Sequence, residues 1–88
     1  MKRQVCFTGK AWDDYLFWQG QDRKMLKRIN MLIEAAARTP FEGIGKPELL
    51  LGNLTGFWSR RVDDEHRLVY AVEEAKIVVI ACRGHYQR

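Results

Sequence analysis

Five residues in the second half of the sequence are of the types that can cut a phosphodiester bond in RNA without a metal ion: Glu48, Arg61, Arg67, His85 and Tyr86. Attack of the 2′-OH on the neighbouring phosphate needs a base for the hydroxyl, cations for the negative charge that builds on the phosphate, and an acid for the leaving oxygen. Glu48, the two arginines and His85 match these roles, and Tyr86 is suited to orient a base or to stack on it. This chemistry requires a fold that brings the five side chains together.

The two arginines flank a predicted turn between two strands. Strand alternation places Ser59 and Arg61 on one face of the first strand, and Arg67 and Val69 on one face of the second. Two exposed cations this close suggest a phosphate site, because an anion between them removes their repulsion. In the alternative interpretation, each arginine pairs with an acidic residue of the turn, namely Asp63, Asp64 or Glu65. The sequence leaves both interpretations open.

The remaining candidates lie where regular elements begin or end. Glu48 directly follows a loop over 41–47 and precedes the apolar run Leu49-Leu50-Leu51, so its carboxylate is expected to be held. His85 and Tyr86 follow the last predicted strand, which places an imidazole that can exchange protons near neutral pH at one end of the sheet. A lone histidine in such a place is often merely exposed. His66 is equally eligible by type, and its position favours a role in the turn.

Hydrophobic periodicity and punctuation predict the elements that carry these residues. A strand over 3–8 is followed by a helix that Thr8 caps and that ends near Gly20, with Trp12, Tyr15, Leu16 and Gln19 on one face. Asp22 is expected to cap a second, strongly amphipathic helix from Arg23 to Arg38. Three antiparallel strands are predicted over 56–62, 67–73 and 76–82, and the last is expected to be central because it is apolar on both faces. The pattern predicts one α+β domain over 1–88, with two helices packed on one face of a mainly antiparallel sheet of about four strands.

Composition narrows the class of protein without deciding its function. The 88 residues are 47% hydrophobic, enough for a single core. The net charge of +4 attracts polyanions, which favours nucleic acid without establishing it. Cys6 and Cys82 fit neither a disulfide framework nor a metal-binding spacing, so we expect reduced core thiols, no metal and no cofactor. With no signal peptide and no membrane-spanning segment in the sequence, a cytoplasmic protein is expected.

Several dense blocks in fixed order cover nearly the whole chain: Ala11-Trp12-Asp13-Asp14-Tyr15 with Trp18, Arg38-Thr39-Pro40-Phe41-Glu42-Gly43, Gly45-Lys46-Pro47-Glu48, Leu54-Thr55-Gly56-Phe57-Trp58-Ser59-Arg60-Arg61, Glu65-His66-Arg67-Leu68-Val69-Tyr70, Ala81-Cys82-Arg83 and His85-Tyr86. With these blocks the sequence resembles the YoeB toxins of the RelE superfamily, the messenger-RNA interferases of bacterial toxin–antitoxin pairs. The resemblance implies a RelE-like, microbial-ribonuclease-like fold and a ribosome-dependent, metal-independent endoribonuclease that cuts messenger RNA. It also implies silencing by a YefM-like antitoxin, and it is compatible with a homodimer.

The resemblance assigns a role to each candidate residue. Glu48 corresponds to the general base, His85 to the general acid, Arg67 to the stabiliser of phosphate charge, Arg61 to a phosphate binder and Tyr86 to a substrate-positioning residue. Lys46 and Glu65 correspond to further contacts with RNA. The chain departs from the family pattern in two places: Leu51 stands where a basic residue is typical, and Gln87-Arg88 extend past the His-Tyr pair.

Two rival hypotheses rest on composition and spacing. A nucleic-acid-binding module without catalysis would use the arginine-bearing strands and would not need Glu48. An interaction domain would use its helices and aromatic residues to bind a protein partner, and would need neither Glu48 nor His85. Substitution of Glu48 separates the hypotheses, because only a nuclease requires a base there.

Overall fold

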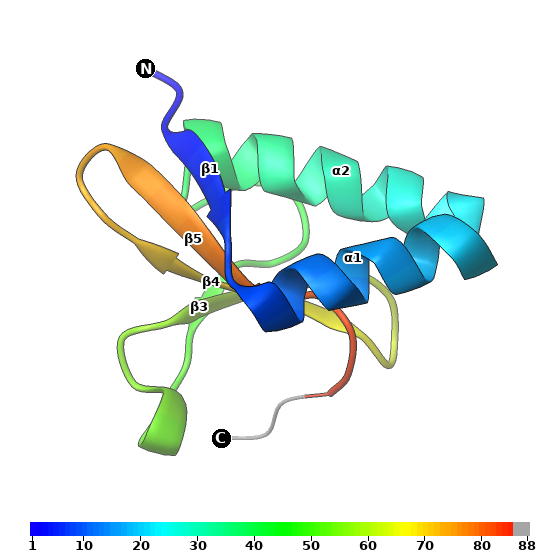
Figure 1. The fold of residues 1–88 in the computed structure, drawn as a ribbon. Coiled ribbons are helices and arrows are strands. Elements are labelled where there is room, and N and C mark those ends of the chain that lie inside the picture. The colour runs from blue at the N-terminus through cyan, green and yellow to red at the C-terminus, as the bar shows by residue number, and fades with distance from the viewer. Residues whose placement is uncertain (86–88) are drawn as a thin grey trace.

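The computed structural model, which describes residues 1–85, consists of two helices packed on a five-stranded sheet (Figure 1). In chain order the elements are β1 Gln4–Phe7, α1 Gly9–Gln21, α2 Arg23–Arg38, β2 Glu48–Leu49, the 3₁₀ turn η1 Gly52–Leu54, β3 Trp58–Arg61, β4 Arg67–Val72 and β5 Lys76–Ala81. The sheet order is β1-β5-β4-β3-β2, with β1 parallel to β5 and all other pairs antiparallel. The predicted α+β class is confirmed. The fifth strand comes from β2, which is only two residues long and which the sequence did not predict.

The two helices begin at the residues that the capping signals predict. The Thr8 hydroxyl accepts a hydrogen bond from the Ala11 amide at 3.2 Å. The Asp22 carboxylate accepts from the amides of Lys24 and Met25 at 3.1 and 3.2 Å, and Asp22 is the single residue between the end of α1 and the start of α2. The predicted bounds of α2 are confirmed, and α1 ends at Gln21, next to the predicted Gly20.

The side of α1 that faces the core differs from the predicted apolar stripe. Ala11, Asp14 and Trp18 are buried, whereas Trp12 is 48% exposed and Leu16 42% exposed. The reason is that α1 packs on the end of β5, where Trp18 Nε1 donates to the Cys82 carbonyl at 2.9 Å and Asp14 accepts from the Cys82 amide at 3.0 Å. Two polar contacts therefore set the rotation of the helix, and hydropathy alone does not reveal them.

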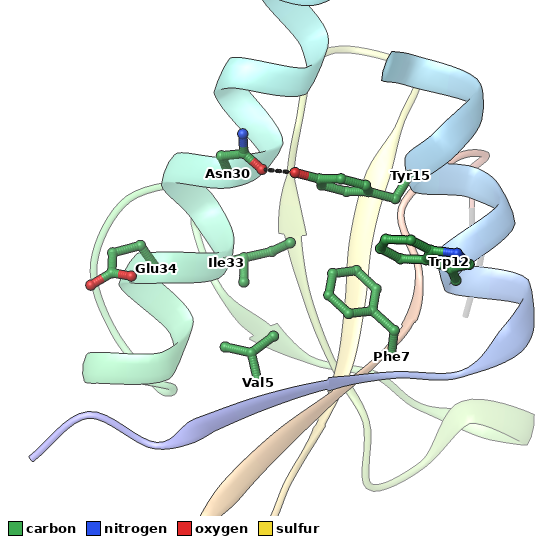
Figure 2. A pocket seen from close by; sticks show the side chains of 7 residues that line it. All are labelled: Val5, Phe7, Trp12, Tyr15, Asn30, Ile33 and Glu34. Atoms are coloured by element: carbon green, nitrogen blue, oxygen red, sulfur yellow. Dashed lines mark hydrogen bonds between the residues drawn. The ribbon is translucent and has the colours of Figure 1, made fainter. Parts of the chain in front are cut away.

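The exposed Trp12 and the half-buried Tyr15 of α1 line an apolar cleft of about 340 Å³ between both helices and β1 (Figure 2). Trp12 and Tyr15 stack with their ring centroids 5.7 Å apart, and Phe7 packs edge-on against both rings. The Tyr15 hydroxyl donates to Asn30 Oδ1 at 2.7 Å, which links the two helices above the cleft.

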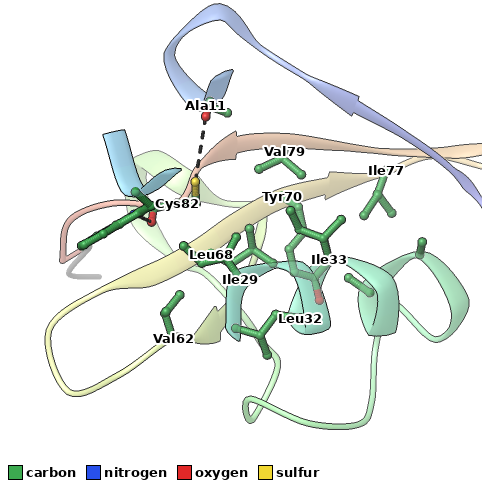
Figure 3. Close-up of a cluster of buried hydrophobic side chains, with 13 residues drawn as sticks. Ala11, Ile29, Leu32, Ile33, Val62, Leu68, Tyr70, Ile77, Val79 and Cys82 are labelled. Atoms are coloured by element: carbon green, nitrogen blue, oxygen red, sulfur yellow. Dashed lines mark hydrogen bonds between the residues drawn. The ribbon is translucent and has the colours of Figure 1, made fainter. Parts of the chain in front are cut away.

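The main core fills the space between the helices and the sheet (Figure 3). Its fully buried members include Ile29 and Leu32 from α2, Leu68 and Tyr70 from β4, and Cys82. Burial, with the nearby Asp14 carboxylate, raises the pKa of the Cys82 thiol to about 12. Cys6 is only half-buried, so the expectation of two core thiols is right for Cys82 alone.

On the other face of the sheet, a smaller cluster contains the buried Leu50, Val69 and Ala81. Neither α1 nor α2 covers this face, which is therefore called the open face of the sheet (Figure 1). β5 is an interior strand, as predicted, with β1 on one side and β4 on the other. Within residues 1–85, no helix has both the length and the hydropathy needed to cross a membrane.

Candidate active site

Strand register brings Glu48 and the two arginines to the open face of the sheet. Glu48 lies opposite Ser59 in the β2–β3 pair, and Arg61 lies directly opposite Arg67 in the β3–β4 pair. Side chains of paired residues point to the same side of a sheet, and so do residues two apart on one strand. Since Ser59 pairs with Val69 of the open-face cluster, Glu48, Arg61 and Arg67 all point away from the helices.

Glu48 and Arg67 form the central pair of this face. Arg67 Nη1 lies 3.5 Å from Glu48 Oε1, and their side chains are 16% and 40% exposed. Arg61 is exposed directly across from Arg67, so the pair presents two cationic groups beside one carboxylate.

One nitrogen of the Arg67 side chain is an unpaired hydrogen-bond donor among the described residues. Its Nε is buried and, within the described part of the chain, has no hydrogen-bond partner. Leaving a buried donor unpaired costs about 1–3 kcal/mol. An unpaired buried donor of this kind needs an explanation, and a role in function is one.

The acidic turn between β3 and β4 provides its own hydrogen bonds. Asp63 accepts from the amides of Glu65 and His66 at 2.9 and 2.6 Å. Burial raises the pKa of Asp63, but these backbone donors outweigh burial and hold that pKa below its usual value. The carboxylate beside Arg67 is Glu48, whereas Asp63 caps the turn.

His85 follows a segment that is fastened to both α1 and β4. The Gly84 carbonyl accepts from the Arg67 amide at 3.0 Å, so the backbone that leads into His85 lies beside Arg67, the first residue of β4. His85 is exposed. Tyr86, the predicted positioning residue, lies outside the described residues, as do Gln87 and Arg88.

Lys46 and Glu65 lie around this centre. Lys46 is exposed two residues before Glu48 and adopts a left-handed backbone conformation, with φ of 51°. Glu65 Oε1 lies 3.7 Å from His66 Nε2, which places Glu65 in the turn beside an imidazole. Leu51, where the family pattern has a basic residue, is 57% exposed.

Arg60, for which no role was predicted, holds the loop that leads to Glu48. The Arg60 side chain is fully buried on the core face of β3, and its guanidinium donates to the Tyr70 hydroxyl at 3.0 Å and to the carbonyls of Thr39, Glu42 and Ile44 at 2.6–2.9 Å. Strand alternation could have revealed this burial, because Arg60 lies between two residues that were assigned to the other face. Its carbonyl partners arise from tertiary structure.

The arrangement can perform acid–base and electrostatic chemistry on an anion. A carboxylate and two guanidinium groups lie together on the open face of the sheet, and the segment that leads to His85 lies beside the backbone of Arg67. Across residues 1–85, His, Cys, Asp and Glu side chains form no group of three or more that could hold a metal ion.

Comparison with known proteins identifies close relatives along nearly the full chain. Residues 7–86 match the family model of the YoeB-like toxin of bacterial type II toxin–antitoxin systems. Toxin YoeB of Synechocystis sp. is 56% identical over 97% of this chain and 99% of its own.

Solved structures agree with the sequence comparison. A YoeB/ParE toxin from Agrobacterium tumefaciens superposes with a TM-score of 0.90 at 50% identity, over 94% of this chain and 99% of that one. YoeB from Staphylococcus aureus, 45% identical over 98% of this chain and 100% of its own, has been solved as a dimer and in a heterotetrameric complex with YefM, with TM-scores of 0.89 and 0.87.

Proposed function

The chain belongs to the YoeB-like toxin family of bacterial type II toxin–antitoxin systems, and from that premise we propose that it is an endoribonuclease that cuts messenger RNA on the ribosome, needs no metal ion for the cut, and thereby halts translation. The observation that carries the proposal is the Glu48–Arg67 pair on the open face of the sheet, with Arg61 directly opposite Arg67.

The proposed reaction is an internal transfer at phosphorus. Glu48 takes the proton of the 2′-OH, the 2′-oxygen bonds to the adjacent phosphorus, and the bond from phosphorus to the 5′-oxygen breaks. His85 gives its proton to that leaving oxygen, so the products are a 2′,3′-cyclic phosphate and a free 5′-OH. Tyr86 is proposed to position the substrate, and Lys46 and Glu65 are proposed as further contacts with the RNA.

The state of Arg67 supports its role as the stabiliser of charge. A donor aimed at the position where negative charge develops lowers the barrier most when it is fixed before the reaction. The Arg67 guanidinium is fixed in this way, because its side chain is only 16% exposed and it forms a salt bridge with Glu48. Arg61 is more exposed and is proposed to bind a flanking phosphate.

The proposed partners follow from charge and from the relatives. An acidic antitoxin segment of the YefM kind would occupy Arg61 and Arg67 as RNA phosphates do, and so block the site. YoeB of Staphylococcus aureus forms a complex with YefM and also a dimer. We propose an antitoxin of that kind and a homodimer for this chain, which would act in the cytoplasm, where the ribosomes are.

The test compares wild type with Glu48→Gln, which keeps the shape of the side chain but cannot accept the proton. Cuts in a defined messenger are mapped by primer extension with ribosomes at constant Mg²⁺. A short RNA without ribosomes is incubated in EDTA, which tests the need for metal separately. Glu48→Gln should slow cleavage by about 10²–10⁴-fold and leave RNA binding intact.

The matched control is Glu74→Gln in the distant turn between β4 and β5, which should cleave as wild type does. The base assignment is wrong if Glu48→Gln cuts as fast as wild type. If the wild-type protein binds RNA but cuts none under any condition, the chain is a binding module and the nuclease proposal is wrong.

A further inference from the structure

The short segment between β5 and His85 contains a joint that ought to be loose. Gly84 has a positive φ of 114°, and glycine has the widest conformational freedom of all residues. A catalytic acid that follows such a joint directly would spend most of its time away from the reacting atoms. A side chain outside the proposed chemistry fixes this joint.

Both peptide groups that flank Gly84 are held by neighbouring residues of one turn. The Gly84 amide donates to His66 Nδ1 at 2.9 Å, and the Gly84 carbonyl accepts from the Arg67 amide at 3.0 Å. The first bond orients the peptide before Gly84 and the second orients the peptide after it. Together they fix both backbone angles of the glycine, and with them the direction in which the chain leaves toward His85.

From this geometry we propose that His66 is a positioning residue, which locks the left-handed turn at Gly84 and so holds His85 beside Arg67. This inference rests on the proposed nuclease function. The Arg67 amide bond belongs to the backbone and is present whatever the side chains are, whereas the His66 bond depends on one imidazole nitrogen.

The surroundings of His66 favour the required form of the ring. To accept from Gly84, Nδ1 must carry no proton, so the ring proton is on Nε2. Glu65 Oε1 lies 3.7 Å from that Nε2 and favours a proton there electrostatically. The His66 ring packs edge-on against Trp18 at 4.8 Å between centroids, which restricts its rotation. In addition to its proposed contact with RNA, Glu65 would then help to keep His66 in the form that accepts from Gly84.

Further contacts fasten the same segment before it reaches Gly84. Trp18 Nε1 donates to the Cys82 carbonyl, and Asp14 accepts from the Cys82 amide. The Arg83 guanidinium lies 3.6 Å from the centroid of the Phe17 ring, a cation–π contact. These contacts anchor residues 82 and 83 on α1, so the backbone of Gly84 is the remaining freedom, and His66 removes it.

Two substitutions separate the hydrogen bond from the packing of the ring. His66→Asn places an amide oxygen near the position of Nδ1, so it can accept from Gly84 but lacks the ring. His66→Phe keeps the ring against Trp18 but cannot accept. If positioning matters, His66→Phe lowers kcat by about 10- to 100-fold with KM nearly unchanged, and His66→Asn retains most of the wild-type kcat.

The experiment measures kcat and KM for ribosomal messenger cleavage by wild type and both variants, together with hydrogen exchange of the Gly84 amide. The expected result is fast exchange and low kcat in His66→Phe, with slow exchange and rescued kcat in His66→Asn. Equal losses in the two variants, or an unchanged kcat when exchange is fast, would overturn the inference. If wild type itself does not cleave, the nuclease proposal fails first, and the exchange data still report whether His66 locks Gly84.

Discussion

Replacing Arg60 with methionine should destabilise the protein by about 3 kcal/mol, because the Arg60 side chain ties the loop before Glu48 to the sheet. The guanidinium donates to the hydroxyl of Tyr70 and to the carbonyls of Thr39, Glu42 and Ile44. Exchange of a buried charge for an apolar side chain can be harmless when its partners are replaced too. Here three partners are backbone carbonyls, which no single substitution removes.

The magnitude follows from these four bonds. A hydrogen bond contributes about 1 kcal/mol net, and one with a charged donor contributes about 1.5–3 kcal/mol. The bond to Tyr70 is fully buried, so its loss leaves the Tyr70 hydroxyl without this donor. The three carbonyl bonds are only part-buried, and water can replace them in part. Methionine fills most of the volume of the arginine stem, so little is added for a cavity.

Urea unfolding followed by tryptophan fluorescence measures this effect. With a slope of about 1–1.5 kcal/mol/M for a chain of this size, the midpoint should fall by about 2–3 M. The matched control is Arg61→Met, one residue further along β3 on the open face, which should change stability by less than about 0.5 kcal/mol. Equal midpoints for the two variants would refute the claim that Arg60 holds the loop.

Two further predictions concern the core. The Cys82 thiol has a pKa of about 12 in the folded protein, whereas an ordinary thiol has 9.0, so between these two pH values Cys82 ionises only in the unfolded chain. The free energy of unfolding should therefore fall, as the pH rises through this window, by about 1.4 kcal/mol per pH unit. Urea titrations from pH 8 to 10.5 should show a shallower decline for Cys82→Ala, and parallel declines would contradict the prediction. Gly45→Ala should cost about 2–4 kcal/mol, because φ is +85° and the new Cβ would lie 2.6 Å from Leu32 Cδ2. Thermal unfolding measures this cost against Gly9→Ala, whose Cβ would meet nothing within 4 Å, and equal melting temperatures would show that the loop can shift freely.

Local signals predicted the elements whose stability is local. The bounds of α2 follow from the Asp22 cap and a long apolar stripe, and both signals lie within one short stretch of the sequence. β2 has no such signal, because its two residues form a strand only by pairing with Trp58 and Ser59 of β3. Its existence depends on a neighbour that is distant in sequence. The rotation of α1 was missed for the same reason, since bonds to Cys82 decide it.

In the candidate site, too, the contacts between neighbouring strands could be predicted from the sequence, and those between distant segments could not. Alternation along two strands was enough to place Arg61 opposite Arg67, and the register does place them there. Which carboxylate meets Arg67 could not be read from spacing, because the turn acids are nearer in sequence than Glu48. The structure resolves the choice through β2, which carries Glu48 to 3.5 Å from Arg67. For His66 the sequence favoured a role in the turn, but its hydrogen bond with Gly84 could not be predicted, because that partner is a backbone amide 18 residues away.

Arg60 and His66 support the proposed general base and general acid in different ways. Arg60 fixes the loop before Glu48 with four hydrogen bonds from inside the core, so its loss should lower both stability and rate. His66 fixes the joint before His85 with a single bond from the rim, so its loss should lower the rate with little change in stability. A plot of log kcat against the free energy of unfolding distinguishes them: Arg60→Met should move along both axes, and His66→Phe, which keeps the ring against Trp18, along the rate axis alone. Activity measured without stability would assign both residues to catalysis, although neither acts on the RNA in the proposed mechanism.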